Sequence, residues 1–119
     1  MGISFSGSSL GSVDESLQVS VSYSTGFAAL RVLGFTFEPD TYGGDIPAVD
    51  VVAAAPMIAL AEDCGDRMAR VAEERGDYEL LNCILQSDRE LWVRRVARRI
   101  VAVAKAAIAV DANAKVSFS

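Results

Sequence analysis

The sequence contains no histidine, and it has only two cysteines. Without histidine, neither a Ser-His-Asp nor a Cys-His catalytic arrangement can be assembled, and the commonest general acid–base group at neutral pH is missing. Cys64 and Cys83 have no cysteine or histidine neighbours at metal-ligand spacing, which argues against a zinc site. Both lie in segments that we predict as helical, so we expect free, largely buried thiols. We predict no cofactor, no metal site and no enzymatic activity.

Signals for a membrane or for export are also scarce. The longest uncharged stretch in the middle of the chain, residues 51–61, spans 11 residues and includes Pro56, whereas a bilayer crossing needs roughly 20. The start of the chain, MGISFSGSSLGS, has neither the basic region nor the long apolar region of a secretory signal. Gly2 and Ser6 match a short myristoylation pattern that Ser-rich starts often match by chance. We expect no membrane association and a cytoplasmic location.

What the chain does contain indicates one folded domain. It has 119 residues, of which 51% are hydrophobic and 23% charged, enough apolar surface for a single core. We predict one domain over residues 1–119, with the Gly- and Ser-rich residues 1–12 as a flexible arm. The formal net charge of −5 is unevenly divided: up to Asp66 nine acids face the single base Arg31, and after it ten bases face seven acids.

The N-terminal third shows strand periodicity. From Leu17 to Ser24 the sequence LQVSVSYS alternates apolar and polar residues, which is typical of a strand with one solvated face in an antiparallel sheet. Ile3 and Phe5 could begin another short strand, and the alternation in the tail DANAKVSFS could add an edge strand. The short likeness between residues 3–6 and 116–119 suggests at most that the two termini pair.

The next segments leave two readings open. Residues 27–33 could form a helix ended by Gly34, or residues 31–38 could form a second strand; we favour a strand through residues 34–37. PDTYGG, residues 39–44, holds enough turn formers to be a loop. AVDVVAAA, residues 48–55, is either a buried strand or an early helical turn.

The rest of the chain is predicted to be mainly helical. Proline is tolerated in the first turn of a helix, so an amphipathic helix is expected over residues 56–75. Gly76 and Asp77 suit the end of that helix and the start of a short one. Ser87 begins an S-x-x-E capping pattern, which places the start of a third helix there.

This last helix, to about Val110, has an apolar arc and a cationic arc. Such a row of guanidinium groups can pair with carboxylates or phosphates, or it can simply be solvated or pair with the acidic half of the chain. The candidate partner-binding residues are Arg94, Arg95, Arg98, Arg99 and Lys105.

Beyond Arg99 the same helix is nearly apolar all round, so it needs cover on most sides. A second subunit could supply that cover as well as the chain's own sheet. We therefore predict a homo-oligomer, most simply a dimer. The predicted interface residues are Trp92, Ile100, Val103, Ala107 and Ile108.

Other groupings carry little chemistry. Glu38, Asp40 and Asp45 surround the turn at Tyr42, but they lack the alternating order of a calcium loop. The glycines of SGSSLGS lack the lysine and the spacing of a phosphate-binding loop. These groups are expected to be solvated loop charges and a flexible arm.

These patterns predict an α+β fold in which a small antiparallel sheet, built mainly from the N-terminal third, packs against two long helices and one short helix. The first functional hypothesis is a non-catalytic protein-binding module, an adaptor or an inhibitor that occludes a partner's surface, as some phage-encoded inhibitors of host machinery do. The second is binding of nucleic acid or another anionic ligand through the arginine face, which an overall pI near 4.6 disfavours. A small-ligand or carboxylate-based enzyme comes third.

Overall fold

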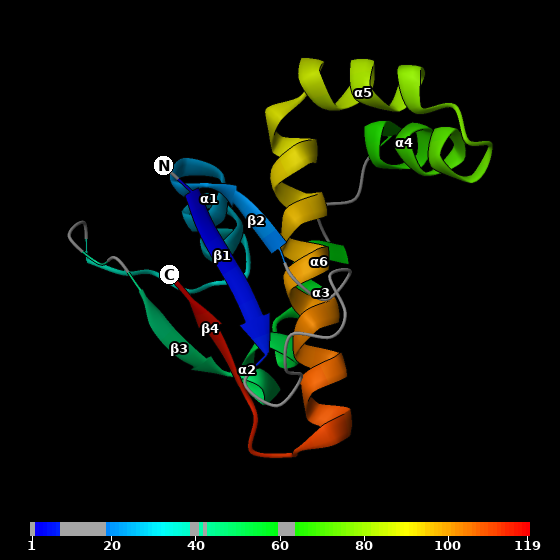
Figure 1. The fold of residues 1–119 in the computed structure, drawn as a ribbon. Coiled ribbons are helices and arrows are strands. Elements are labelled where there is room, and N and C mark those ends of the chain that lie inside the picture. The colour runs from blue at the N-terminus through cyan, green and yellow to red at the C-terminus, as the bar shows by residue number, and fades with distance from the viewer. Residues whose placement is uncertain (1, 8–18, 39–40, 42, 60–63) are drawn as a thin grey trace.

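The computed structural model describes residues 2–7, 19–38, 41, 43–59 and 64–119. These residues form six helices and one four-stranded sheet (Figure 1). The strands are β1 (Gly2–Gly7), β2 (Val19–Ser22), β3 (Gly44–Pro47) and β4 (Lys115–Phe118), in the order β2-β1-β4-β3 with every neighbouring pair antiparallel. The predicted α+β class with a small antiparallel sheet is confirmed, although the helices outnumber the three that were predicted.

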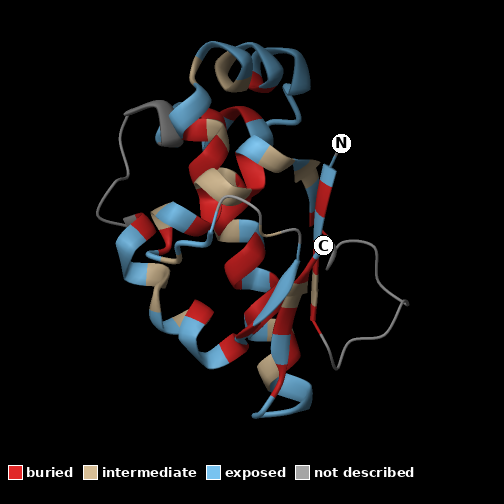
Figure 2. Ribbon diagram, turned by 90° about the vertical axis from the view of Figure 1, so that its left-hand side faces the viewer, coloured by how far each residue is buried: buried red, intermediate tan, exposed pale blue. Residues whose placement is uncertain are grey.

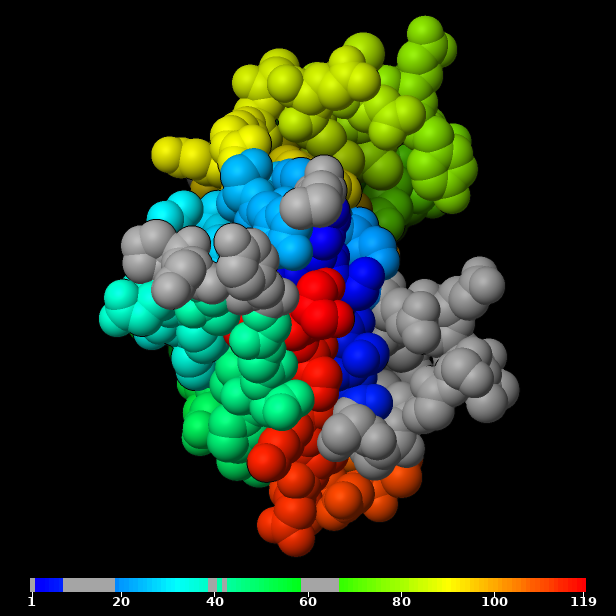
Figure 3. All heavy atoms as spheres, turned by 60° about the vertical axis from the view of Figure 1, so that its left-hand side comes forward, coloured from blue at the N-terminus to red at the C-terminus, as the bar shows by residue number. Residues whose placement is uncertain are grey.

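The two ends of the chain pair at the centre of the sheet. Phe5 lies opposite Phe118 and Gly7 opposite Val116, so the suggested pairing of the termini is correct. The tail is therefore an inner strand and not an edge strand, as Figure 3 shows with β4 between β1 and β3. The prediction of a flexible arm is wrong for residues 2–7, because Ile3 and Phe5 are wholly buried; residues 8–12 lie outside the described ranges.

The main core lies between one face of the sheet and α6 (Arg89–Val110). Alternating residues of the strands are buried, as the striping in Figure 2 shows, and they pack with α1 (Tyr23–Val32), α2 (Ala48–Ala53) and α6. The other face carries serines, with Ser4 and Ser20 joined by their side-chain hydroxyls at 2.9 Å. This confirms the predicted solvated face for residues 19–22; Tyr23 already begins α1, and Leu17 and Gln18 lie outside the described ranges.

Residues 27–32, which could have been helix or strand, belong to the helix α1. Ser22 caps its start by accepting a hydrogen bond from the Thr25 backbone N–H at 3.4 Å. At its end Gly34 adopts φ of 91°, the Gly34 N–H donates to the Arg31 carbonyl and the Phe35 N–H donates to the Leu30 carbonyl. This is a Schellman motif, in which only glycine is unstrained at the left-handed position. The favoured strand over residues 34–37 is wrong, since the motif turns the chain away.

Residues 48–53 form α2, which follows β3 directly. The second open alternative, strand or helix after residue 48, is therefore resolved in favour of a helix. The predicted helix over residues 56–75 is wrong as one element. It comprises α3 (Ala55–Ala59) and α4 (Cys64–Glu74), which pack against different parts of the molecule. Pro56 does lie in the first turn of α3, as expected from its missing backbone N–H.

Helices α4 and α5 (Tyr78–Ser87) form a hairpin at the N-terminal end of α6, away from the sheet (Figure 1). A small separate core of four buried residues, Ala69, Ala72, Leu81 and Leu91, joins the three helices. Asp77 caps α5 as predicted, accepting from the Leu80 N–H at 3.2 Å.

The start of α6 differs from its predicted position. Asp88, and not Ser87, caps the helix by accepting from the Leu91 N–H at 3.1 Å. The Ser87 hydroxyl instead donates to the Ile84 carbonyl at the end of α5. Cys83 on α5 is exposed, contrary to the expected burial, because the hairpin is only two helices thick. The side chain of Cys64 is not among those that the structure describes.

The predicted oligomer interface is largely covered within one chain. Ile100 and Ala107 have no exposed surface, and Val103 is 1% exposed. Helices α1, α2 and α3 cover the flanks of α6 that the sheet alone would leave open, whereas the prediction considered only the sheet as cover within the chain. Trp92 and Ile108 are half-buried. Self-association stays a prediction, but this argument for it is wrong.

Candidate functional site

The predicted cationic row does not lie on one exposed face. Arg94 is only 6% exposed, because it lies beside Val93 where α1 packs against α6. Arg95 and Arg98 are half-buried, whereas Arg99 and Lys105 are exposed. The prediction that Arg94 belongs to an accessible binding face is therefore corrected, and the other four cations remain candidates.

Three of these arginines line a hollow between α6 and the α4–α5 hairpin. We call it the arginine hollow, and its volume is about 510 Å³. Helix α4 contributes a fourth arginine. The lining residues are Arg70, Glu73, Leu85, Trp92, Arg95, Arg98 and Arg99.

An ion pair crosses the arginine hollow. The Arg95 Nη2 atom lies 2.6 Å from the Glu73 Oε2 atom, so the pair links α6 to α4. The Glu73 side chain is 53% exposed, and a solvated pair of this kind stabilises the fold by only about 0 to 1 kcal/mol. The pair is more informative about binding than about stability, because it shows that a guanidinium group of this hollow can pair with a carboxylate.

The basic surface continues along α6. Arg70 and Arg98 also border a second, smaller hollow of about 260 Å³ that reaches Lys105 and is floored by apolar residues of α3 and α6. Arg95, Arg98, Arg99 and Lys105 are thus brought into one strip along α6, and Arg70 joins it from α4. Sequence reasoning missed Arg70 and Glu73 because it treated the polar face of α4 as solvated.

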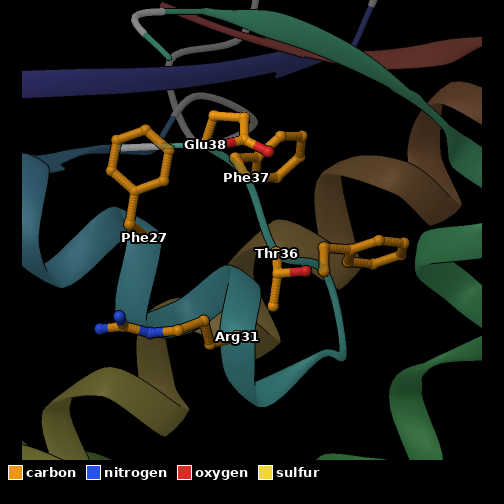
Figure 4. Close-up of a pocket in the computed structure, with 6 residues that line it drawn as sticks. Phe27, Arg31, Thr36, Phe37 and Glu38 are labelled. Atoms are coloured by element: carbon orange, nitrogen blue, oxygen red, sulfur yellow. The ribbon is translucent and has the colours of Figure 1, made fainter. Parts of the chain in front are cut away.

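A different pocket lies between α1 and the segment that follows it. It has a volume of about 470 Å³ and is lined by Phe27 and Arg31 of α1 and by the segment 35–38 (Figure 4). The sequence reasoning missed it because it favoured a strand there, whereas the Schellman motif folds this segment back over α1.

The outer flank of the hairpin carries a shallow apolar groove. Exposed Met68, Val71 and Leu80 line it, and Arg67 and Arg75 border it. Its volume is about 290 Å³.

Two of the three loop carboxylates lie within the described residues. Glu38 and Asp45 are exposed, the Ser117 hydroxyl donates to Asp45, and Asp40 lies outside the described ranges. Among the residues with assigned positions, no group of three or more carboxylates and cysteines could hold a metal ion. In the same part of the chain, no helix is both long and apolar enough to cross a bilayer.

Comparisons with models of protein families, with curated proteins and with solved structures found no match to this chain.

Proposed function

We propose that this chain is a non-catalytic binding module that holds an acidic segment of a partner protein in the arginine hollow. The observation that carries the proposal is local charge. Among the described residues, four arginines and one carboxylate line one hollow of a chain whose formal net charge is −5. Guanidinium groups bind carboxylates through paired, charge-assisted hydrogen bonds, so clustered arginines favour an acidic ligand.

The apolar part of the lining refines the class of ligand. Trp92 is half-buried beside Arg95 and Arg99, and Leu85 faces the same space from α5. Tryptophan and arginine are the residues that most often dominate binding energy at protein interfaces. A segment that alternates acidic and apolar side chains would use both parts of the hollow. Its capture would occlude that segment from other proteins, as an adaptor or an inhibitor does.

Nucleic acid is the second candidate, because the strip from Arg99 to Lys105 could follow a phosphate backbone. Two features favour protein. A chain with pI near 4.6 repels a long nucleic acid more strongly than a short acidic segment, because the segment carries fewer negative charges. Glu73 would also lie against any phosphate in the hollow, whereas a peptide can place an apolar or amide group there.

The test uses two labelled probes in fluorescence anisotropy, a peptide of repeated Glu-Glu-Leu triplets and a single-stranded oligonucleotide of the same formal charge. We expect the peptide to bind more tightly at physiological salt. Arg95→Glu combined with Arg99→Glu should weaken peptide binding at least tenfold, about 1.4 kcal/mol.

The matched control is Arg67→Glu combined with Arg75→Glu, which makes the same charge change on the outer flank of α4. It should weaken peptide binding less than about threefold, through long-range charge alone. Equal losses in both double variants, or no peptide binding by the parent, would overturn the proposal. Tighter binding of the oligonucleotide would favour the nucleic-acid alternative.

Glu73 gives a second arm to the test. Glu73→Gln removes the internal carboxylate that occupies Arg95. We expect peptide affinity to rise severalfold, while the free energy of unfolding falls by less than about 1 kcal/mol because the pair is solvated. Unchanged or weaker peptide binding, measured by the same anisotropy titration, would count against a carboxylate-binding hollow.

The partner could be a second copy of the chain, whose N-terminal half is acidic. Light scattering at micromolar concentration tests this, because a dimer would shift toward monomer in the Arg95→Glu, Arg99→Glu variant. A monomeric parent would assign the acidic segment to a different protein.

A further inference from the structure

The pocket between α1 and the segment 35–38 has the size of a small-molecule site. Its volume of about 470 Å³ falls within the range of such sites. Phe27 and Arg31 are one helical turn apart on α1, and both line the pocket. The facing wall comes from Thr36, Phe37 and Glu38.

The aromatic wall is held in place by other rings. Phe27 stacks on Tyr23 with ring centroids 6.1 Å apart, and it meets the edge of Phe37 at 6.3 Å. Phe37 in turn lies 5.0 Å from Phe118 of the inner strand β4. Even so, Phe37 is 37% exposed, so part of its surface remains open to a ligand. A wall fixed in this way costs little conformational entropy when a ring binds.

The two charged groups, Arg31 and Glu38, make the two ends of the pocket chemically different. Figure 4 shows Arg31 and Glu38 at opposite ends of the group of lining residues, with Phe27 and Phe37 nearer to Glu38. Both side chains are exposed. A ligand that spans the pocket therefore meets a cation at one end and a hydrogen-bond acceptor at the other.

We propose that this pocket binds a small aromatic carboxylate whose ring carries a hydrogen-bond donor. The ring lies against Phe27 and Phe37, where an aromatic pair contributes about 0.5 to 1.5 kcal/mol beyond area burial. The carboxylate pairs with the Arg31 guanidinium, and a ring N–H or O–H donates to Glu38. Glu38 disfavours a second anionic group at the ring end, so a monoanion fits better than a dianion.

The experiment uses indole-3-propionate as the probe, titrated into uniformly ¹⁵N-labelled full-length chain. We expect amide shifts confined to residues 25–38 and 116–118, with a dissociation constant below about 1 mM. Two related molecules report the separate contacts. Indole-3-propionamide lacks the negative charge, and 1-methylindole-3-propionate lacks the ring N–H. Each should bind about tenfold more weakly than the parent acid.

Two variants locate the contacts on the protein. Arg31→Met keeps the apolar stem and should weaken the acid about tenfold while leaving the amide unchanged. Glu38→Gln should lower affinity for the indole severalfold and affect the N-methyl analogue less. Arg67→Met, an exposed arginine on α4, is the matched control and should change nothing.

Equal binding of acid and amide would overturn the proposal. So would shifts located elsewhere, or no shifts at about 5 mM probe. Since none of these residues lines the arginine hollow, this result and the peptide test are independent.

Discussion

At the scale of single residues, close packing overrides local propensity in α1. Gly26 lies in the first half of the helix and is buried against β1. A Cβ atom there would overlap the Ile3 side chain and touch the ring of Phe5. Glycine is thus kept in a helix, where alanine is intrinsically better by about 1 kcal/mol, because the sheet approaches too closely for a methyl group.

We expect Gly26→Ala to lower the free energy of unfolding by up to about 2 kcal/mol, since overpacking costs about 1 to 3 kcal/mol and helix propensity returns about 1 kcal/mol. Urea denaturation measures the change. Ala102→Gly on the exposed side of α6 is the comparison, and it should be destabilising by about 1 kcal/mol from propensity alone. A more stable Gly26→Ala protein would show that β1 can move away from α1.

At the scale of elements, the boundaries of helices depend on which side chain reaches the free backbone N–H groups. Ser87 and Asp88 are neighbours, and both residue types are good caps. The Ser87 hydroxyl is used at the end of α5, so Asp88 caps α6.

Asp88→Ala should therefore cost about 1 kcal/mol of stability, whereas Ser87→Ala should cost less than about 0.5 kcal/mol. Thermal and urea unfolding of both variants measures the difference. The reverse order of costs would restore Ser87 as the cap and contradict the helix boundary described above.

At the scale of the whole molecule, the fold is closed by its two ends. Phe118 is 2% exposed and pairs with Phe5 across the central strands, while its ring also meets Phe27 and Phe37. The last strand thus links the sheet, α1 and the aromatic pocket. Stability and the integrity of the pocket should fall together when this ring is removed.

We expect Phe118→Ala to cost about 3 to 5 kcal/mol, a large share of the 5 to 15 kcal/mol that typically stabilises a domain. Ser119→Ala is the matched control, because its side chain is exposed and its backbone bonds to Ser4 are retained. Urea denaturation followed by far-UV circular dichroism measures both. A loss below about 1 kcal/mol for Phe118→Ala would mean that β4 contributes little to the core.

The sequence by itself determined what short-range physics can decide. The alternation of residues 19–22, the cap at Asp77 and the apolar arc of α6 were all predictable from spacing and residue type, whereas the helix end at Gly34 was only the less favoured of two alternatives. The class of the fold followed from them. The candidate cations on α6 were also found, because charge periodicity on a helix needs no partner to be seen.

Only the tertiary structure decided which of these residues are exposed and which of them lie close together. It buried Arg94 under α1 and enclosed Ile100 and Ala107. It also placed Arg70 and Glu73 of α4 beside Arg95 and folded Phe37 over Phe27. The physical reason is that exposure and proximity depend on contacts between residues far apart in the chain, and no local periodicity encodes which distant helix covers a given face.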